Sequence, residues 1–166
     1  MKHLLLMLFL VLAFTVNAQE TGDTVSKENS IGLIISGSGF NAFRLGGGVY
    51  FARLTNTRRY TIGWDTGTLF EYSFNDDVMY NRAYFHITSG NPPALLGASV
   101  VLAYDKDGIS FGLAPEIGVG LSSYWGLFFR YNLFINSRFN SYEVVFRLNL
   151  CKMNFSGNDK KFKVIF

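Results

Sequence analysis

Residues 108–121 read Gly-Ile-Ser-Phe-Gly-Leu-Ala-Pro-Glu-Ile-Gly-Val-Gly-Leu and alternate strictly between two kinds of side chain. Large apolar residues and one proline occupy every second position from Ile109 to Leu121, with Ser, Gly, Ala and a single Glu between them. A period of two indicates a β-strand with two different faces. A soluble sheet usually turns Lys, Glu and Thr to water, whereas small residues and one carboxylate fit a crowded polar interior. The stretch therefore predicts a small membrane-spanning β-barrel whose apolar face meets lipid.

The same alternation recurs along the chain and predicts an all-β, antiparallel, up-and-down transmembrane barrel of about eight strands. In residues 60–74, for example, Trp64 and Tyr72 share one face and Asp65 and Glu71 share the other. Clusters of Gly, Asn, Asp and Pro separate the alternating segments, as turns do. The expected strands are residues 31–40, 43–54, 60–74, 78–88, 94–104, 108–121, 124–134 and 142–150.

The composition agrees with strands in lipid rather than in water. Of the 166 residues 49% are hydrophobic, 17% aromatic and only 16% charged, against about 25% charged in typical globular proteins. Between positions 31 and 150 the only lysine is Lys106, which lies in a turn. The net charge of +3 is too small to indicate nucleic-acid binding. The single thiol, Cys151, has no partner in the sequence for an internal disulfide and is interpreted as a small buried hydrophobe.

Residues 1–18 have the pattern of a secretory signal peptide. Lys2 and His3 form a charged start, residues 4–14 an apolar run, and Ala18 ends a small-residue cleavage site. The apolar run is too short to span a bilayer as a helix. No run of 18 apolar residues follows it, so the sequence predicts that any membrane crossing uses strands.

The rest of the chain is expected to form one domain. Residues 19–30 are polar and charged and are interpreted as a flexible N-terminal segment, followed by a single barrel domain over residues 31–166. Within it, residues 152–166 are either a tail or a closing strand. Pro115 lacks the N–H that a closed ladder needs, so we expect a local bulge there.

With its signal peptide, its alternation and a terminal aromatic at Phe166, the chain resembles the small outer-membrane β-barrel proteins of bacteria, the OmpA/OmpX-like class of about eight strands. The resemblance covers most of residues 31–166 and rests on pattern rather than on a family motif. It implies a place in the bacterial outer membrane, with outer-membrane lipid and the barrel-assembly machinery as partners. It transfers no functional residue. The short connections between strands argue against a receptor or adhesin role.

The polar faces of the expected strands carry a set of charges that would meet inside the barrel. An eight-stranded barrel is only wide enough for side chains to fill its interior, so these charges should pair. Glu116, Arg130 and Glu143 lie on successive strands and are the expected centre of a structural salt-bridge network; a gate or proton path is the alternative. The predicted network comprises Asp65, Glu71, Arg82, Glu116, Arg130, Glu143 and Arg147.

Three further features of the sequence bear on a catalytic or ligand-binding role. His86 is the only histidine beyond the signal peptide, so a lipid-modifying enzyme would need it near Ser99 or Ser110, whereas a hydrogen-bonded structural role is the more common one. Residues 37–42 match a Gly-x-Gly-x-x-Ala dinucleotide fingerprint, but a strand-like segment follows where the fingerprint needs a helix. Residues 105–108 are too short a run of ligands for a calcium loop.

The leading interpretation is therefore a non-enzymatic outer-membrane barrel with a filled lumen and a structural or envelope-interaction role, without catalytic residues, metal or cofactor. Two alternatives stay open. A soluble exported barrel could bind an apolar ligand with its aliphatic and aromatic face turned inward. An outer-membrane lipid-modifying enzyme could use His86.

Overall fold

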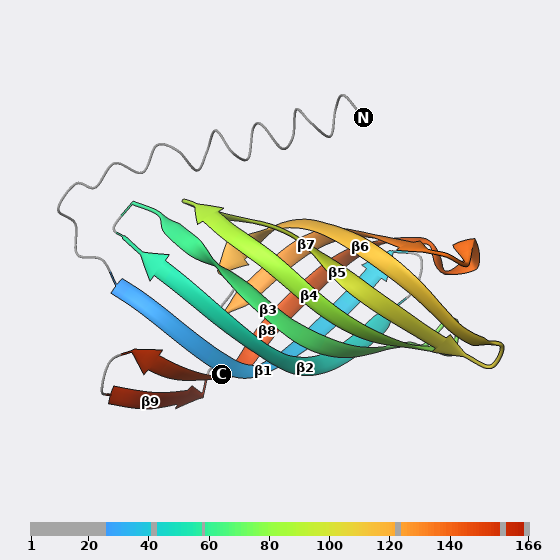
Figure 1. Cartoon of the computed structure of the whole chain (residues 1–166), viewed down its shortest axis with the longest axis horizontal. Helices are drawn as coiled ribbons and strands as arrows, with labels where there is room; N and C mark the ends of the chain where they lie inside the picture. The colour runs from blue at the N-terminus through green and yellow to red at the C-terminus, as the bar shows by residue number, and fades with distance from the viewer. Residues whose placement is uncertain (1–25, 41–42, 58, 122–123, 157–158, 165–166) are drawn as a thin grey trace, which may run out of the picture.

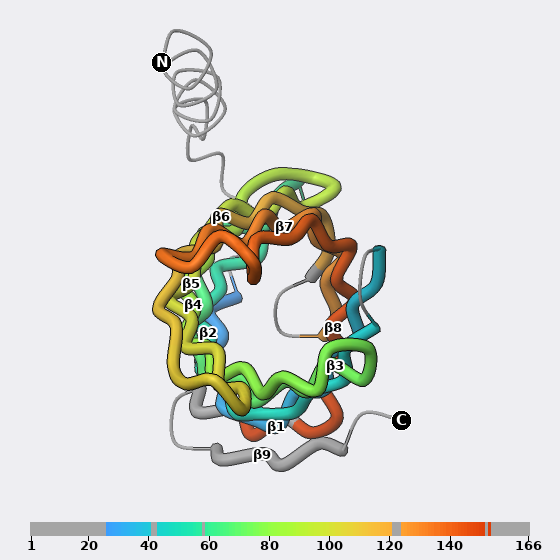
Figure 2. Tube along the Cα trace, turned by 90° about the vertical axis from the view of Figure 1, so that its right-hand side faces the viewer, coloured from blue at the N-terminus to red at the C-terminus, as the bar shows by residue number. Residues whose placement is uncertain are grey.

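The computed structural model describes residues 26–40, 43–57, 59–121, 124–156 and 159–164, and this part of the chain is almost entirely β-strand. Each strand pairs antiparallel with the next in sequence, and β1 also pairs with β8, so eight strands close into an up-and-down barrel (Figure 1). Seen from its end, the barrel is a ring of strands (Figure 2). The elements are β1 (Ser26–Phe40), β2 (Arg44–Asn56), β3 (Thr61–Ser73), β4 (Val78–Gly90), β5 (Pro93–Asp105), β6 (Gly108–Leu121), β7 (Trp125–Phe134), the 3₁₀ turn η1 (Ser137–Phe139), β8 (Ser141–Ser156) and β9 (Asp159–Val164).

The alternation in the sequence decides which side chains face inward. In β6, Ile109 and Leu113 are exposed on the outside, while Ser110, Ala114 and Glu116 are buried inside. Successive side chains of a strand point to opposite faces, so one face of every strand lines the interior. The eight expected strands are confirmed, β6 with the same bounds as expected, β1 and β8 with longer ends, and the others with ends moved by one or two residues.

Pro115 is accommodated without the expected bulge. It pairs with Ala98 of β5, and the register between β6 and β7 is the same on both sides of it, at Leu113↔Leu133 and Glu116↔Arg130. The ladder between β6 and β7 is simply interrupted between these two pairs, which places the missing N–H on the β7 side. The expectation of a bulge at Pro115 is therefore wrong.

A register shift occurs instead where the barrel closes. Leu33 of β1 pairs with Cys151 of β8, while the next residue, Ile34, pairs with Asn149. One residue of β8, Leu150, is thus inserted between the two pairs, as in a β-bulge.

Both ends of the barrel domain differ from expectation. β1 begins at Ser26, so residues 26–30 belong to the barrel and not to a flexible segment, because Ser26 to Ser30 pair with β2. At the other end β8 continues to Ser156, and β9 pairs with that extension (Figure 1). Residues 152–154 therefore help to close the barrel as part of β8, since they pair with β1, whereas β9 pairs with β8 alone among the described strands. The predicted signal peptide over residues 1–18 and Phe166 lie outside the described residues.

Apolar side chains form three buried clusters inside the barrel. One cluster, which includes Val78, Phe134 and Phe139, lies near the connections 74–77 and 135–140. A second comprises Ile34, Tyr50, Ala52, Leu69 and Tyr84, and a third Leu95, Phe128 and Val145. Over the described ranges, no helix combines the length and the apolar character needed to span a bilayer.

Candidate functional site: the charged interior of the barrel

The seven charged residues predicted to meet inside the barrel all lie on its inward face. They come from β3, β4, β6, β7 and β8, and none of them is more than 4% exposed. The positions follow from strand phase: Glu71, Glu116 and Glu143, for example, each stand between two exposed neighbours. The seven residues are Asp65, Glu71, Arg82, Glu116, Arg130, Glu143 and Arg147.

Arg130 is the centre of the largest group of ion pairs. Its guanidinium donates to Glu71 at 3.2 Å and through Nε to Glu143 Oε2 at 3.0 Å, and Nη2 also pairs with Glu143. Arg82 donates from Nε to Glu71 Oε2 at 3.1 Å and from Nη2 to Asn132 at 3.0 Å. Two arginines thus share Glu71, which compensates charges that burial would otherwise leave costly.

The expected contact between Glu116 and Arg130 is present but long, and the shortest ion pair of Glu116 is with Arg147. Glu116 approaches Arg130 only to 4.0 Å, whereas Arg147 donates to Glu116 Oε2 at 2.6 Å and Ser99 donates to Oε1 at 2.9 Å. Glu71 lies closer to Arg130, at 3.2 Å. Glu116 therefore pairs most closely with its nearest donors, Arg147 and Ser99, although its strand lies next to that of Arg130.

Arg44 belongs to the network and was not among the predicted residues. It pairs with Glu143 and donates to Tyr80 Oη at 3.1 Å and Ser141 Oγ at 3.3 Å. Its carbon Cζ lies 4.0 Å from the centre of the Tyr80 ring. The signal was present in the sequence, because Arg44 stands between Phe43 and Leu45 and so falls on the inward phase.

His86 forms a second polar group with Glu116 and Arg147. Its Nδ1 lies 3.3 Å from Asp65 Oδ2, and its Nε2 lies 3.1 Å from Glu116 Oε2. The imidazole stacks with Tyr84 and Phe128, with ring centres 4.8 Å apart in each pair. Arg147 Cζ lies 4.5 Å from the Tyr84 ring centre and 4.6 Å from that of Phe128. The group thus combines two carboxylates, two nitrogen bases and two aromatic rings.

The serines considered as partners of His86 are placed differently from each other. Ser99 lies on the opposite side of Glu116 from the ring, donating to Oε1 while Nε2 of His86 contacts Oε2. Ser110 accepts from the backbone N of Asn136, near the connection between β7 and β8. The structure therefore brings Ser99 into the group through Glu116 and leaves Ser110 in another part of the barrel.

Glycines on the inward face make room for these side chains. A Cβ at Gly46 would lie 2.7 Å from Glu71 Cγ and 2.9 Å from Ser36 Oγ, so the interior is tightly packed at Gly46. A Cβ at Gly97 would lie 2.2 Å from Cδ2 of His86 and 2.2 Å from the carbonyl oxygen of Phe85. The carbonyl oxygen of Phe85 and the ring of His86 both lie close to Gly97, and moving either of them away costs free energy.

Replacing Gly97 with alanine is expected to destabilise the barrel by about 1–3 kcal/mol, the usual range for overpacking a well-packed interior. The measurement is the free energy of unfolding by urea, followed by tryptophan fluorescence. Gly39→Ala is the matched control, because its Cβ would have no heavy atom within 4 Å. Equal stabilities of the two variants would show that His86 is not held against β5.

The two motifs that suggested other ligands have structural explanations. The apolar segment after residues 37–42 is strand β2, so no helix follows the Gly-x-Gly pattern and a dinucleotide fold is excluded there. In the turn between β5 and β6, Asp105 and Asp107 accept from Arg138 at 2.6 and 2.9 Å. Among the described residues, no group of three or more His, Cys, Asp or Glu side chains is arranged to hold a metal ion.

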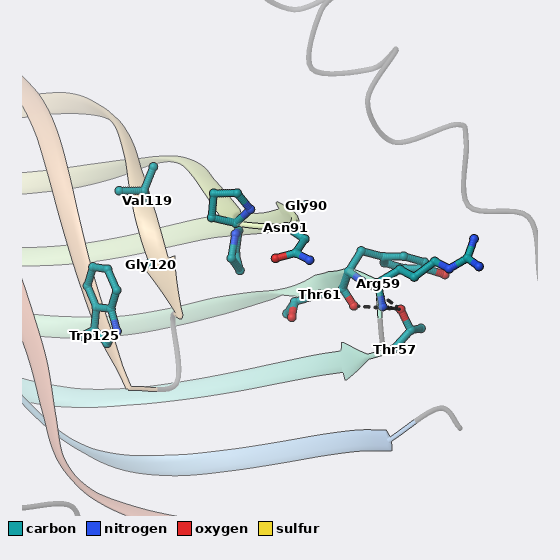
Figure 3. A pocket seen from close by; sticks show the side chains of 11 residues that line it. Thr57, Arg59, Thr61, Gly90, Asn91, Val119, Gly120 and Trp125 are labelled. Carbon is teal, nitrogen blue, oxygen red and sulfur yellow. Dashed lines mark hydrogen bonds between the residues drawn. The ribbon is translucent and has the colours of Figure 1, made fainter. Parts of the chain in front are cut away.

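Two pockets lie at the ends of the barrel. One, of about 460 Å³, lies at the end where β1 begins and is lined by residues of three connections, including Thr57, Asn91, Pro92 and Trp125 (Figure 3). Thr57 Oγ1 accepts from the backbone N of Tyr60 at 3.0 Å and holds that connection in shape. The other pocket, of about 420 Å³, lies near η1 and reaches Arg44, Asp76 and Arg138.

Comparison of the chain with protein-family models, with curated proteins and with solved structures gave no match.

Proposed function

We propose that this chain is a bacterial outer-membrane β-barrel protein with a filled lumen and a non-enzymatic role, either structural or as an interaction partner within the envelope. The observation that carries the proposal is the apolar belt: the outward face of the barrel consists largely of exposed aliphatic and aromatic side chains, whereas four arginines and four carboxylates are buried inside. A monomeric soluble protein rarely exposes contiguous apolar patches of more than a few hundred Å². The belt includes Ile31, Leu33, Ile35, Leu45, Val49, Phe51, Phe70, Phe85, Ile87, Val100, Phe111, Leu113, Ile117, Val119, Leu127, Phe129, Leu133, Val144 and Phe146.

The dimensions of the strands support the same conclusion. A strand tilted across a bilayer needs about 9–11 residues, and the barrel strands have 10 to 16. Closure of β1 on β8 leaves no barrel edge unpaired in lipid. Aromatic side chains gather near strand ends, where Tyr131 and Tyr142 stack at 4.4 Å and Tyr72 and Phe74 meet edge to face at 5.0 Å. Such residues suit the boundary between lipid and water.

The interior supports a filled lumen rather than an open pore. A barrel of eight strands is just wide enough for side chains to fill it. Arg82 and Arg130 are fully buried, and within 4.0 Å Arg82 contacts the carboxylates of two residues and Arg130 those of three. Charges held in this way are not free to line a water-filled channel. With short connections between the strands, the role we propose is structural or by contact within the envelope.

The alternatives account less well for the geometry. A soluble barrel that binds an apolar ligand needs its aliphatic and aromatic face turned inward, and the described strands turn that face outward. A lipid-modifying enzyme needs its catalytic groups at the lipid boundary, whereas His86 is fully buried and its two ring nitrogens contact Asp65 and Glu116. The proposed partners are accordingly outer-membrane lipid and the barrel-assembly machinery, with export directed by residues 1–18.

The proposal predicts that the protein is recovered in the sarkosyl-insoluble membrane fraction and migrates differently in SDS gels with and without boiling. A closed barrel keeps its paired backbone in SDS until it is heated, so the unboiled protein is expected to run as a compact band. Recovery from the soluble periplasmic fraction with no boiling-dependent shift would contradict the membrane assignment. It would leave the outward belt as a surface for another protein.

A further inference from the structure

Three side chains from three strands form a row inside the barrel: Asp65 from β3, His86 from β4 and Glu116 from β6. The ring of His86 is in the middle, with Nδ1 3.3 Å from Asp65 Oδ2 and Nε2 3.1 Å from Glu116 Oε2. Asp65 and His86 are also direct partners in the β3–β4 ladder. All three side chains are at least nine-tenths buried.

The donors and acceptors of the row determine how many protons the ring of His86 must carry. An ionised carboxylate only accepts hydrogen bonds, and a neutral imidazole has one N–H and one lone pair. Two contacts from one imidazole to two carboxylates therefore need an N–H at both ring nitrogens. Glu116 is held as the ion, because it accepts from Arg147 at 2.6 Å and from Ser99 at 2.9 Å.

We propose that Asp65, His86 and Glu116 form a buried proton-binding site, in which His86 carries both ring protons at neutral pH and this proton latches β3, β4 and β6 together. The inference goes beyond the proposed function and does not depend on it. It rests on contacts inside the barrel and holds whether lipid or water surrounds the outside.

The groups around the ring differ in whether they favour or disfavour the second proton on His86. The positive charge of Arg147 disfavours this proton, since Nη1 of Arg147 lies 3.3 Å from Nε2 and 3.5 Å from Nδ1 of His86. Oε2 of Glu116 contacts both cations and compensates both. Tyr84 on β4 and Phe128 on β7 stack with the ring, and Ser99 on β5 reaches it only through Glu116.

The site is also the place where the charge of the interior can change. Among the described residues buried inside the barrel, the arginines Arg44, Arg82, Arg130 and Arg147 balance the carboxylates Asp65, Glu71, Glu116 and Glu143. The proton on His86 adds one positive charge to this balance. Loss of that proton on raising the pH leaves a lone pair facing one carboxylate, and the latch weakens. The contact between His86 and Asp65 is the one expected to break, because Asp65 Oδ1 has no hydrogen-bond partner among the described residues.

The test is ¹⁵N NMR of the full chain labelled at histidine and reconstituted in lipid or detergent. The chain has two histidines, His3 and His86, so in the variant His3→Gln the remaining signals belong to His86. The expected result at pH 7 is a pair of similar ring ¹⁵N shifts for His86, as in imidazolium. Two widely separated shifts, as in neutral imidazole, would overturn the proposal without any need for a variant in the row to fold.

The variant Asp65→Asn distinguishes a protonated His86 that is held by Asp65 from a ring that is held by packing alone. Removing an opposite charge this close to an ionisable group changes its protonation equilibrium by roughly tenfold or more, so the ratio of imidazolium to imidazole at a given pH is expected to fall by that factor. Asp77→Asn is the matched control, because Asp77 accepts from Tyr72 in the turn after β3. An unchanged ratio in Asp65→Asn would show that Asp65 does not hold the proton.

Discussion

Replacing Arg130 with methionine is expected to lower the free energy of unfolding by about 3–5 kcal/mol, the usual consequence of removing one partner from a buried ion pair. Arg130 contacts both oxygens of Glu71 and pairs with Glu143. After its removal Glu71 keeps Arg82 and Glu143 keeps Arg44, but each of the two carboxylates has one arginine partner fewer. The loss is therefore one of ion pairs as well as of hydrogen bonds.

The double variant Arg130→Met/Glu143→Gln is expected to be more stable than Arg130→Met alone. It removes one of the two carboxylates that lose Arg130, and glutamine can still accept from Arg44 and Asn132, which contact Glu143 in the structure. Coupling between residues in one such network is about 0.5–3 kcal/mol. Unfolding by urea from lipid vesicles, followed by the fluorescence of Trp64 and Trp125, measures all three proteins on one scale.

Arg138 provides the control for this experiment. It also pairs with two carboxylates, Asp105 and Asp107, but its side chain is 43% exposed at the end of the barrel. Solvent screens such pairs, so Arg138→Met is expected to cost less than about 1 kcal/mol. If Arg130→Met were as mild as Arg138→Met, the interior charges would be solvated rather than paired, and the lumen would not be filled.

Much of the fold could be predicted from the sequence because strand alternation is a local property. The backbone turns successive side chains to opposite faces whatever surrounds them, so β6 and the inward positions of Glu71 and Arg130 follow from phase. Neighbouring strands joined by short connections then pair in sequence order. The beginning of β1 at Ser26 was missed, because residues 26–30 lack a strong apolar alternation and become strand only by pairing with β2.

The partners within the site could not be predicted in the same way. Which carboxylate meets which arginine depends on the stagger of strands around the barrel, which no single segment encodes. For this reason strand order pointed to Glu116 as the partner of Arg130, whereas in the structure Glu71 lies closer to Arg130. Arg44 was overlooked for a different reason: the glycines at 46–48 weaken the alternation just beyond it, although its own phase is clear.

The proposed membrane location predicts that replacing Leu113 with arginine destabilises the barrel by about 2–4 kcal/mol, the cost of a lipid-facing cation near the middle of the apolar belt. Leu113 is 52% exposed on the outside of β6, and its neighbours Val100 and Leu133 belong to the same belt. Ile109 lies on the same strand and face, next to the turn that starts β6, and is 70% exposed. Ile109→Arg is therefore expected to cost only about 0–1 kcal/mol, as near a membrane interface.

The pair of variants distinguishes lipid from water outside the barrel, because the two positions differ in depth but not in face. In water both arginines would be solvated, and both variants would unfold at the urea concentration of the unmodified chain or above it. In lipid the cost depends on depth, so Leu113→Arg alone should lose stability when the proteins are unfolded from vesicles. Equal behaviour of Leu113→Arg and Ile109→Arg would contradict the membrane assignment even if the barrel itself were intact, since neither side chain touches the charged interior.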